Sequence, residues 1–482
     1  MNTSKFQLTL GLALACAAIT LSVAVRAHAQ TFTTLAAFNG VNGTAPFFGS
    51  LVQSTNGNYY GSTVHGGKKG YGVIFQLTPA GKLTELYSFC ALASCTDGTF
   101  PMVAPILGSD GNFYGTTYSG GNSSNSGTVY KMTIGGKLTT LYSFCPTQPC
   151  SDGVSPVGVI EGSNGNFYGV AQYGGAYGDG TFFELTSLGE FRVLHSFCAQ
   201  PGCGSGANPG ASPMQASNGN FYGTAARGGF HSGGVVYEIT PAGSYKALYN
   251  FCSQTNCADG SYPQSTLVQD ANGNLYGTTL YGGAYGDGTV FEITPSDQYI
   301  VLHSFNANDD TDGGFPQSAP TLANDGNLYG TTANGGNEGH GNIYQITPEG
   351  TYTSLYTFCN DSTCSAYDAA YGLLQGTDGI FYGATADGGS HDEGVVYSFS
   401  NNLGPLVKTV PAAAAVGARV IVLGNGLTGA TSVTFNGVSA AFTVESDTYL
   451  TATVPTGATT GVVSVVTPSG TLNSNPQFVV AK

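Results

Sequence analysis

A five-residue motif, Gly-Asn-(aromatic or Leu)-Tyr-Gly, recurs in this chain every 53 or 54 residues. It begins at Gly57, Gly111, Gly165, Gly219, Gly273 and Gly326, and a weaker copy, Gly-Ile-Phe-Tyr-Gly, begins at Gly379. A period of about 20–50 residues marks solenoids and propellers, in which each repeat is one supersecondary unit. The chain is therefore expected to fold as seven similar units.

Each repeat contains four strand-like runs, named a to d here. Strand a is the apolar stretch before the motif, strand b contains the motif, and a Gly-Gly pair separates strand b from strand c. Strand d ends in Leu-Tyr-Ser-Phe, as at residues 86–89 and 141–144. Four short antiparallel strands per unit predict a propeller blade rather than a solenoid coil, which needs about 20–30 residues per turn.

The two ends of the array complement each other. The seventh repeat stops after its strand c, residues 394–400, whereas residues 33–38 have the pattern of strand d without a repeat of their own. We therefore predict an all-β fold in which residues 30–402 form a seven-bladed β-propeller, with residues 31–38 as the outer strand of blade seven. Closure of this kind removes the exposed sheet edges of an open array.

The amino-terminal residues have the pattern of a signal peptide, residues 1–29. Lys5 precedes an apolar run at residues 8–25, and Ala27-His28-Ala29 is a small-residue cleavage site. A lipoprotein would instead use Cys16, although Ala13 stands where Leu is usual. No other apolar run is long enough to span a bilayer. We expect a protein that is secreted, at the cell surface or extracellular, with the periplasm as an alternative.

The composition limits the partners of the chain. Only 9% of the residues are charged, and 73 glycines, 29 tyrosines and no tryptophan are typical of short strands joined by glycine-rich turns. Loss of Lys5 and Arg26 with the signal peptide changes the formal net charge from −15 to −17. Such an acidic surface repels nucleic acid and anionic lipid. An extracellular carbohydrate or protein is the expected ligand.

Ten of the eleven cysteines form five C-x4-C pairs in the loops between strands d and a. The pairs are Cys90/Cys95, Cys145/Cys150, Cys198/Cys203, Cys252/Cys257 and Cys359/Cys364. Repeat five loses both members together, and Asn306 stands where the first would be. Joint presence or absence predicts five local disulfides in an oxidising compartment. A metal–thiolate site is the weaker alternative, because successive pairs belong to different blades.

Up-and-down connectivity puts the cysteine-bearing d–a loops and the b–c loops on one face, which we call the loop face. Because loops on a repeated scaffold carry most binding sites, this face is the candidate ligand site. Its candidate contact residues are Tyr173, Tyr177, His231, Tyr281, Tyr285, His340 and His391. Tyrosines can stack on sugar rings or anchor a protein partner. Those of the repeated motif, such as Tyr114, are instead expected to pack between blades.

One sector of the loop face is rich in acidic residues. The candidate ligands for a metal are Asp309, Asp310 and Asp312 in the fifth d–a loop and Asp392 in the seventh b–c loop. Oxygen-rich loops suit Ca²⁺, and paired carboxylates can hydrolyse glycosides. The alternative is structural, because Asp-Gly recurs as a turn at Asp97 and Asp152. No sequence motif assigns a catalytic residue.

Residues 403–482 differ in character from the repeats. They contain short β-branched runs, such as residues 418–423 and 461–467, separated by Gly and Pro. This spacing predicts a small β-sandwich. The order of its motifs resembles the IPT/TIG domain, an immunoglobulin-like module that in exported proteins more often spaces or attaches another domain than performs chemistry.

Residues 31–400 resemble the Gloeo/Verruco tandem repeat family through motifs such as Gly-Asn-Leu-Tyr-Gly-Thr-Thr and Gly-Thr-Val-Tyr-Glu-Ile-Thr-Pro. That resemblance implies export and a choice of carboxy-terminal anchors, but no established reaction. The sequence thus favours a non-catalytic binding or scaffold protein. A polysaccharide hydrolase or lyase that uses the acidic sector, and a structural adhesion or surface-layer component, are the alternatives.

Overall fold

The computed structural model describes residues 30–46, 51–360, 364–369 and 371–481. Over these ranges the chain is all-β, with three short 3-10 segments, η1 (Ala93–Cys95), η2 (Pro201–Cys203) and η3 (Thr255–Cys257). The predicted signal peptide lies outside the described residues. In the described part of the chain, no helix has the length and apolar character needed to cross a membrane.

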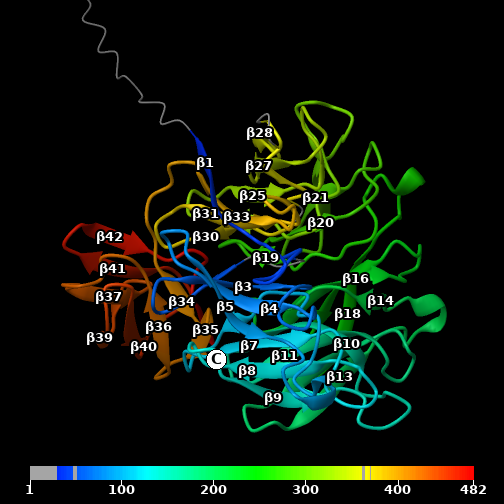
Figure 1. The fold of residues 1–482 in the computed structure, drawn as a ribbon, viewed down its shortest axis with the longest axis horizontal. Coiled ribbons are helices and arrows are strands. Elements are labelled where there is room, and N and C mark those ends of the chain that lie inside the picture. The colour runs from blue at the N-terminus through cyan, green and yellow to red at the C-terminus, as the bar shows by residue number, and fades with distance from the viewer. Residues whose placement is uncertain (1–29, 47–50, 361–363, 370, 482) are drawn as a thin grey trace, which may run out of the picture.

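Residues 31–400 form seven antiparallel sheets, each with strands a to d in that order (Figure 1). Strands a are β2 (Val52–Gln53), β6 (Ile106–Leu107), β10 (Val154–Glu161), β14 (Ala207–Pro209) with β15 (Met214–Gln215), β19 (Val268–Gln269), β24 (Thr321–Leu322) and β30 (Leu374–Gln375). Strands b are β3 (Tyr59–Thr63), β7 (Phe113–Thr117), β11 (Phe167–Tyr173), β16 (Phe221–Arg227), β20 (Leu275–Thr279), β25 (Leu328–Thr331) and β31 (Phe381–Thr385).

The outer half of each sheet consists of strands c and d. Strands c are β4 (Val73–Leu77), β8 (Thr128–Met132), β12 (Thr181–Leu185), β17 (Val235–Ile239), β21 (Thr289–Ile293), β27 (Asn342–Ile346) and β33 (Val395–Ser400). Strands d are β5 (Leu83–Ser88), β9 (Leu138–Ser143), β13 (Phe191–Ser196), β18 (Tyr245–Asn250), β22 (Tyr299–Ser304), β28 (Tyr352–Thr357) and β1 (Thr31–Ala37). Two short pairs lie beside these sheets, β23 (Gly313–Gly314) with β26 (Asn334–Gly335) and β29 (Ala366–Tyr367) with β32 (Asp387–Gly388).

The tyrosine of the repeated motif packs between neighbouring sheets. Tyr114 is buried and stacks on Phe167 of the next repeat, with ring centroids 4.1 Å apart. The prediction that this tyrosine packs between repeats is therefore confirmed. Tyr382 of the seventh repeat stacks in the same way on Tyr59 of the first repeat, at 4.0 Å.

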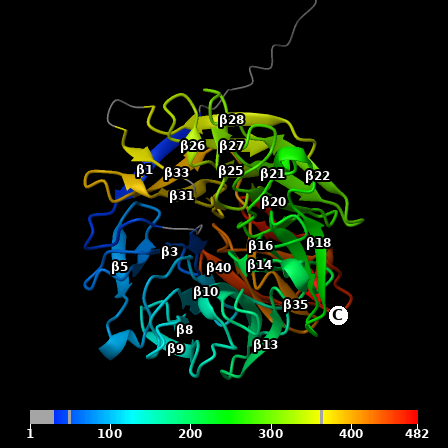
Figure 2. The same cartoon turned by 90° about the vertical axis from the view of Figure 1, so that its right-hand side faces the viewer.

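The amino-terminal strand completes the seventh sheet. β1 pairs antiparallel with β33, from Thr31 opposite Ser400 to Ala37 opposite Val395, as predicted for these two segments. The first and seventh repeats also share a hydrogen bond from the Thr377 N–H to Gln53 Oε1 (3.0 Å). Figure 2 shows the sheets arranged around a common centre. The contacts that join consecutive repeats thus also join the last repeat to the first.

The innermost strands surround an apolar cavity of about 460 Å³. Its lining includes one residue from each of six repeats at intervals of 54, namely Val103, Val157, Ala211, Ser265, Ala319 and Leu373. Val410, from the carboxy-terminal segment, also lines this cavity. The carboxy-terminal segment therefore contributes to the wall of this cavity.

Residues 408–481 form a separate pair of sheets with one shared core. One sheet has the order β34 (Lys408–Val410), β36 (Arg419–Leu423), β40 (Tyr449–Thr453), β39 (Phe442–Val444). The other has the order β38 (Val438–Ser439), β37 (Ser432–Phe435), β41 (Val463–Thr467), β42 (Gly470–Asn473), and β35 (Ala413–Ala415) pairs parallel with β43 (Val479–Ala481). Val422 and Leu450 from the first sheet pack with Val433 and Val465 from the second.

This segment packs against the a–b turns of the repeats. Ile421 and Leu423 share a buried cluster with Tyr60 and Leu107. Thr448 Oγ1 donates a hydrogen bond to the Thr55 carbonyl (2.5 Å), which lies in the first a–b turn. Figure 1 shows this segment on one side of the repeats, so the opposite side stays uncovered.

Candidate functional site

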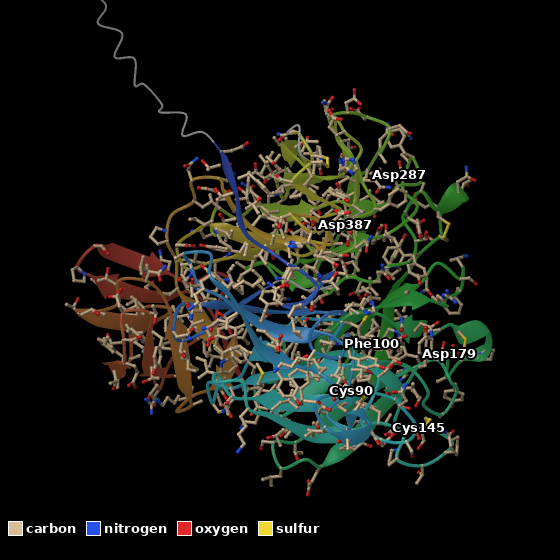
Figure 3. The ribbon with its side chains drawn as sticks, viewed as in Figure 1. Cys90, Phe100, Cys145, Asp179, Asp287 and Asp387 are labelled. Carbon is tan, nitrogen blue, oxygen red and sulfur yellow. A yellow bond between two sulfur atoms is a disulfide. The ribbon has the colours of Figure 1, made fainter. Side chains whose placement is uncertain are left out.

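The uncovered side is the loop face predicted from connectivity. In each repeat the d–a loop pairs with the end of strand b, for example Thr99 with Ser119 and Ser261 with Tyr281. The Gly-Gly pair then docks on the cysteine loop, because the Gly121 N–H donates to the Cys95 carbonyl at 2.9 Å. Both kinds of loop therefore lie together, away from the carboxy-terminal segment, as Figure 3 shows for Asp179 and Asp287 in b–c loops and for Cys145 in a d–a loop.

All five predicted disulfides are present in the loop face. They join Cys90–Cys95, Cys145–Cys150, Cys198–Cys203, Cys252–Cys257 and Cys359–Cys364. The fifth d–a loop, which has no cysteine, is held by side-chain hydrogen bonds instead. Asn306 Oδ1 accepts from the Asn308 N–H (3.2 Å), and Asp309 Oδ1 accepts from the Thr311 N–H (2.9 Å).

Where a d–a loop contains an Asp-Gly turn, the aspartate anchors the loop. Asp97 is fully buried, and its Oδ2 accepts from the Tyr87 hydroxyl (2.7 Å) and the Ala91 N–H (2.8 Å). Asp312 occupies the same position in repeat five, where it accepts from the Asn306 N–H and lies 3.1 Å from His303 Nε2. Asp312 therefore has the structural role of a turn aspartate.

A ring of seven residues with left-handed backbone lies in or directly after the d–a loops, one for each loop. Its members are Ala45, Phe100, Ser155, Asn208, Tyr262, Phe315 and Asp368, with φ between 47° and 59°. Bulky residues adopt this conformation only when their surroundings impose it. Here the Phe100 N–H donates to the Tyr71 carbonyl of the preceding repeat (2.9 Å), and the Tyr262 N–H donates to the Gly233 carbonyl (2.8 Å). The backbone conformation is the same at all seven positions, whereas the side chains vary. The loop face therefore differs from repeat to repeat through the side chains of this ring.

Repeats three to five present aromatic side chains to solvent. Tyr173, Tyr177, Tyr281 and Tyr285, all predicted contact residues, are exposed, and Phe230 in the intervening repeat is 73% exposed. Tyr281 lies between Tyr262 and Phe315 of the ring, with centroid distances of 5.8 and 5.9 Å. The structure thus brings the predicted tyrosines onto one contiguous group of loops.

The three predicted histidines lie in different settings. His231 is exposed in the same loop as Phe230. His340 packs edge-on against Tyr367, at 5.2 Å between ring centroids. His391 Nδ1 lies 2.8 Å from the Ser390 hydroxyl. His340 and His391 both line a shallow pocket of about 690 Å³ that includes Asp392.

The predicted metal ligands are not gathered into one cluster. In the described part of the chain, the groups of three or more His, Cys, Asp or Glu with ligand atoms within 4.8 Å are His340/Cys359/Cys364 and Asp179/Cys198/Cys203, and none contains Asp309, Asp310, Asp312 or Asp392. Both groups contain a disulfide, whose sulfurs are not thiolates. Asp392 Oδ1 accepts from the Tyr367 hydroxyl at 2.6 Å.

A different pair of carboxylates stands out in repeat seven. Burial, and next the charge of Asp387, raise the pKa of Asp368. Burial, followed by the charges of Asp392 and Glu393, raises the pKa of Asp387. Asp368 belongs to the left-handed ring, and sequence reasoning missed it because Asp368 has no glycine beside it to mark the turn. The signal that could have identified it is its place in the repeat, 53 residues after Phe315.

Among solved structures, a Pseudomonas aeruginosa periplasmic gluconolactonase is 15% identical, with 64% of this chain and 84% of that chain covered and a TM-score of 0.40. A chain of the mitotic checkpoint complex is 11% identical, with 83% and 99% covered and a TM-score of 0.46. A puromycin hydrolase is 10% identical, with 68% and 48% covered and a TM-score of 0.40.

These similarities carry no argument about activity, because both the identities and the TM-scores are low. No curated protein matches the chain. The Gloeobacter/Verrucomicrobia repeat matches residues 21–205 and residues 158–397, which overlap and together cover most of the sequence. The chain belongs to the Gloeobacter/Verrucomicrobia repeat family.

Proposed function

We propose that this chain is an exported, non-catalytic binding protein whose residues 30–402 form a closed seven-bladed β-propeller. Its loop face recognises an extracellular carbohydrate or protein. Residues 1–29 would be removed as a signal peptide. The five disulfides and the absence of a spanning helix from the described residues are compatible with that location.

The observation that carries this proposal is the group of exposed aromatic side chains in the b–c loops of repeats three to five. Large aromatic side chains normally lose water contact on folding, and an exposed group of them on one face is typical of a binding surface. Tyr177, Phe230 and Tyr285 all project from loops whose backbone is tied to a cysteine loop. A rigid aromatic surface binds with little loss of conformational entropy.

Residues 403–482 are proposed to be an immunoglobulin-like domain of the IPT/TIG type. Two sheets with one shared core support this assignment. The domain covers the a–b turns, so it leaves the loop face accessible and would hold it away from any surface to which the protein is attached. The proposed role is therefore a spacer or an attachment unit.

The test is binding of residues 30–482 to a glycan array and to proteins of the producing cell's envelope. The substitution of Tyr177, Phe230 and Tyr285 by alanine is expected to reduce the signal at least tenfold. Leu188→Ala is the matched control, because Leu188 is an exposed apolar residue in a c–d turn. Unchanged binding of the triple variant would reject the loop face as the binding surface.

Catalysis as a polysaccharide hydrolase or lyase is the second candidate function. The raised pKa of Asp387 favours the protonated carboxyl that a general acid requires, and Asp368 supplies a neighbouring carboxylate. Release of reducing sugar by the wild-type protein, abolished in Asp387→Asn, would establish this function. Turnover abolished by Asp309→Ala or Asp392→Ala would likewise favour an enzyme.

A further inference from the structure

We infer that the loop face contains two like subsites, in repeats three and five, and that together they bind a neutral polysaccharide with a repeating sugar unit. This inference rests on the proposed binding function and specifies its ligand class. The subsites are the b–c loops at residues 173–180 and 281–288.

The two loops have the same sequence. Each reads Tyr-Gly-Gly-Ala-Tyr-Gly-Asp-Gly, and the other five b–c loops of the chain differ from it and from one another. The repeat of the scaffold accounts for the shared Gly-Gly pair. It does not account for two exposed tyrosines and an aspartate that appear together in these two loops and not in the loop between them.

The two loops also have the same structure. The Gly174 N–H donates to the Gly178 carbonyl at 3.1 Å, and the Gly282 N–H donates to the Gly286 carbonyl at 3.2 Å. A Cβ atom added at Gly178 or Gly286 would meet no atom within 4 Å, so both loops extend into open space. Two loops of the same sequence and backbone hydrogen bonding therefore lie on either side of repeat four, and Oδ2 of Asp287 also accepts a hydrogen bond from the Ala307 N–H (2.9 Å).

The exposure of the tyrosines matches from loop to loop. Tyr173 and Tyr281 are 42% and 46% exposed, and Tyr177 and Tyr285 are 56% and 62% exposed. Tyr177 and Tyr285 therefore leave more than half of each side chain open to a ligand, whereas Tyr281 is flanked by Tyr262 and Phe315. Phe230 lies in the intervening repeat and offers a further ring between the two subsites.

The chemistry of the subsites fits a sugar unit. The apolar face of a pyranose ring can stack on an aromatic ring, while its hydroxyl groups donate hydrogen bonds to a carboxylate such as Asp179 or Asp287. The formal net charge of −17 after loss of residues 1–29 repels acidic polymers. Two like subsites on one rigid scaffold match a polymer that offers the same unit twice, and binding of the second unit becomes intramolecular.

The experiment is calorimetric titration of residues 30–482 with cello-, xylo-, chito- and malto-oligosaccharides of two to eight units. At least one series is expected to bind as short fragments at two equal sites per chain and as long fragments at 1:1 with about 100-fold higher affinity. Tyr177→Ala and Tyr285→Ala should each leave one site for the short fragments and remove the gain shown by the long ones. The control is Lys69→Ala, at the equivalent position of repeat one.

Three results would overturn the inference: no binding by any series, one site per chain at every length, or affinity unaffected by both tyrosine substitutions. Failure of the inference differs from failure of the proposed function. If the array or the envelope proteins still bind through Phe230 while the oligosaccharides occupy a single site, the loop face is a binding surface without paired subsites. If the triple alanine variant binds as the wild type does, both proposals fail.

Discussion

The ring of Tyr382 stacks on the ring of Tyr59 with their centroids 4.0 Å and their planes 29° apart. Tyr114 stacks on Phe167 with nearly the same values, 4.1 Å and 28°. The first pair joins the last repeat to the first, and the second pair joins two consecutive repeats. The junction between the ends of the array thus has the geometry of an internal one.

This equivalence predicts equal costs for two matched substitutions. Tyr382→Ala and Tyr114→Ala each remove a buried ring and a hydroxyl that donates to an aspartate, Asp378 or Asp110. Each should lower the free energy of unfolding by about 3–5 kcal/mol. Urea denaturation monitored by tyrosine fluorescence measures both. A cost for Tyr382→Ala below half that for Tyr114→Ala would show that the array is open at this junction.

The disulfides are expected to stabilise single loops without being needed for the fold. Each closes a ring of six residues, for which the entropic contribution is about 2 kcal/mol. The double substitution Cys145→Ser/Cys150→Ser should therefore fold and melt a few degrees lower. Far-ultraviolet circular dichroism during a thermal scan is the measurement. The wild type in a reducing agent should show a larger shift, and loss of all β structure in the double variant would contradict the prediction.

His195 offers a test of the interaction between a histidine of strand d and the turn residue of the following d–a loop. Its Nε2 is buried with no hydrogen-bond partner, and burial lowers the pKa of this histidine to about 4. In repeat five, the corresponding histidine is His303, and it lies beside Asp312. In the loop that follows His195, Ser205 stands at the position of Asp312. Ser205→Asp should therefore raise the pKa of His195 and stabilise the protein by about 1 kcal/mol below pH 6.

The pH dependence follows from the sign of that shift. Because the folded pKa lies below the ordinary value of about 6.5, the unfolded state takes up the proton first, and stability falls as the pH drops from about 6.5 to about 4. Urea denaturation at pH 7 and at pH 5 measures how much of the free energy of unfolding is lost at the lower pH. This loss should be smaller for Ser205→Asp than for the wild type. It should be larger for the reciprocal variant, Asp312→Ser. Equal losses in all three proteins would be inconsistent with this account.

Asp387 should destabilise the fold at neutral pH. Its pKa is raised by burial and by its acidic neighbours, so the folded state holds its proton to a higher pH than the unfolded state does. Stability should then decrease as the pH rises from about 4 through the folded pKa. Asp387→Asn removes this cost, and the variant should be more stable than the wild type at pH 7 and equal to it near pH 3. A variant less stable than the wild type at pH 7 would disprove the prediction.

The regular part of the fold could be predicted because every repeat contains the same pattern of strands and turns. The spacing of the five-residue motif located strand b seven times, with Gly-Ile in place of Gly-Asn in the last copy. The unpaired pattern at residues 33–38 had a matching gap after residues 394–400. Cysteines that appear and disappear in pairs located the disulfides for the same reason. Tyr114 could be assigned to packing because its position recurs in every repeat.

Contacts that do not recur could not be predicted from the sequence. The apolar residues Val410 and Leu423 belong to ordinary strands of the carboxy-terminal segment, and nothing in their pattern indicates that they face the repeats. The role of Asp312 was ambiguous, because acidic side chains serve equally as turn anchors and as metal ligands. The left-handed position of Asp368 depends on backbone contacts between repeats, which have no local sequence signature.

The pairing of β1 with β33 means that the seventh sheet cannot be completed until nearly all of the repeats have been synthesised. A ribosome releases β1 long before β33, at about 5–20 residues per second, so the earliest strand made must wait for the latest one in its sheet. During that interval its backbone groups are open to strands of other chains. A holding chaperone that shields residues 31–37 until β33 has been made would therefore raise the yield of correctly assembled protein.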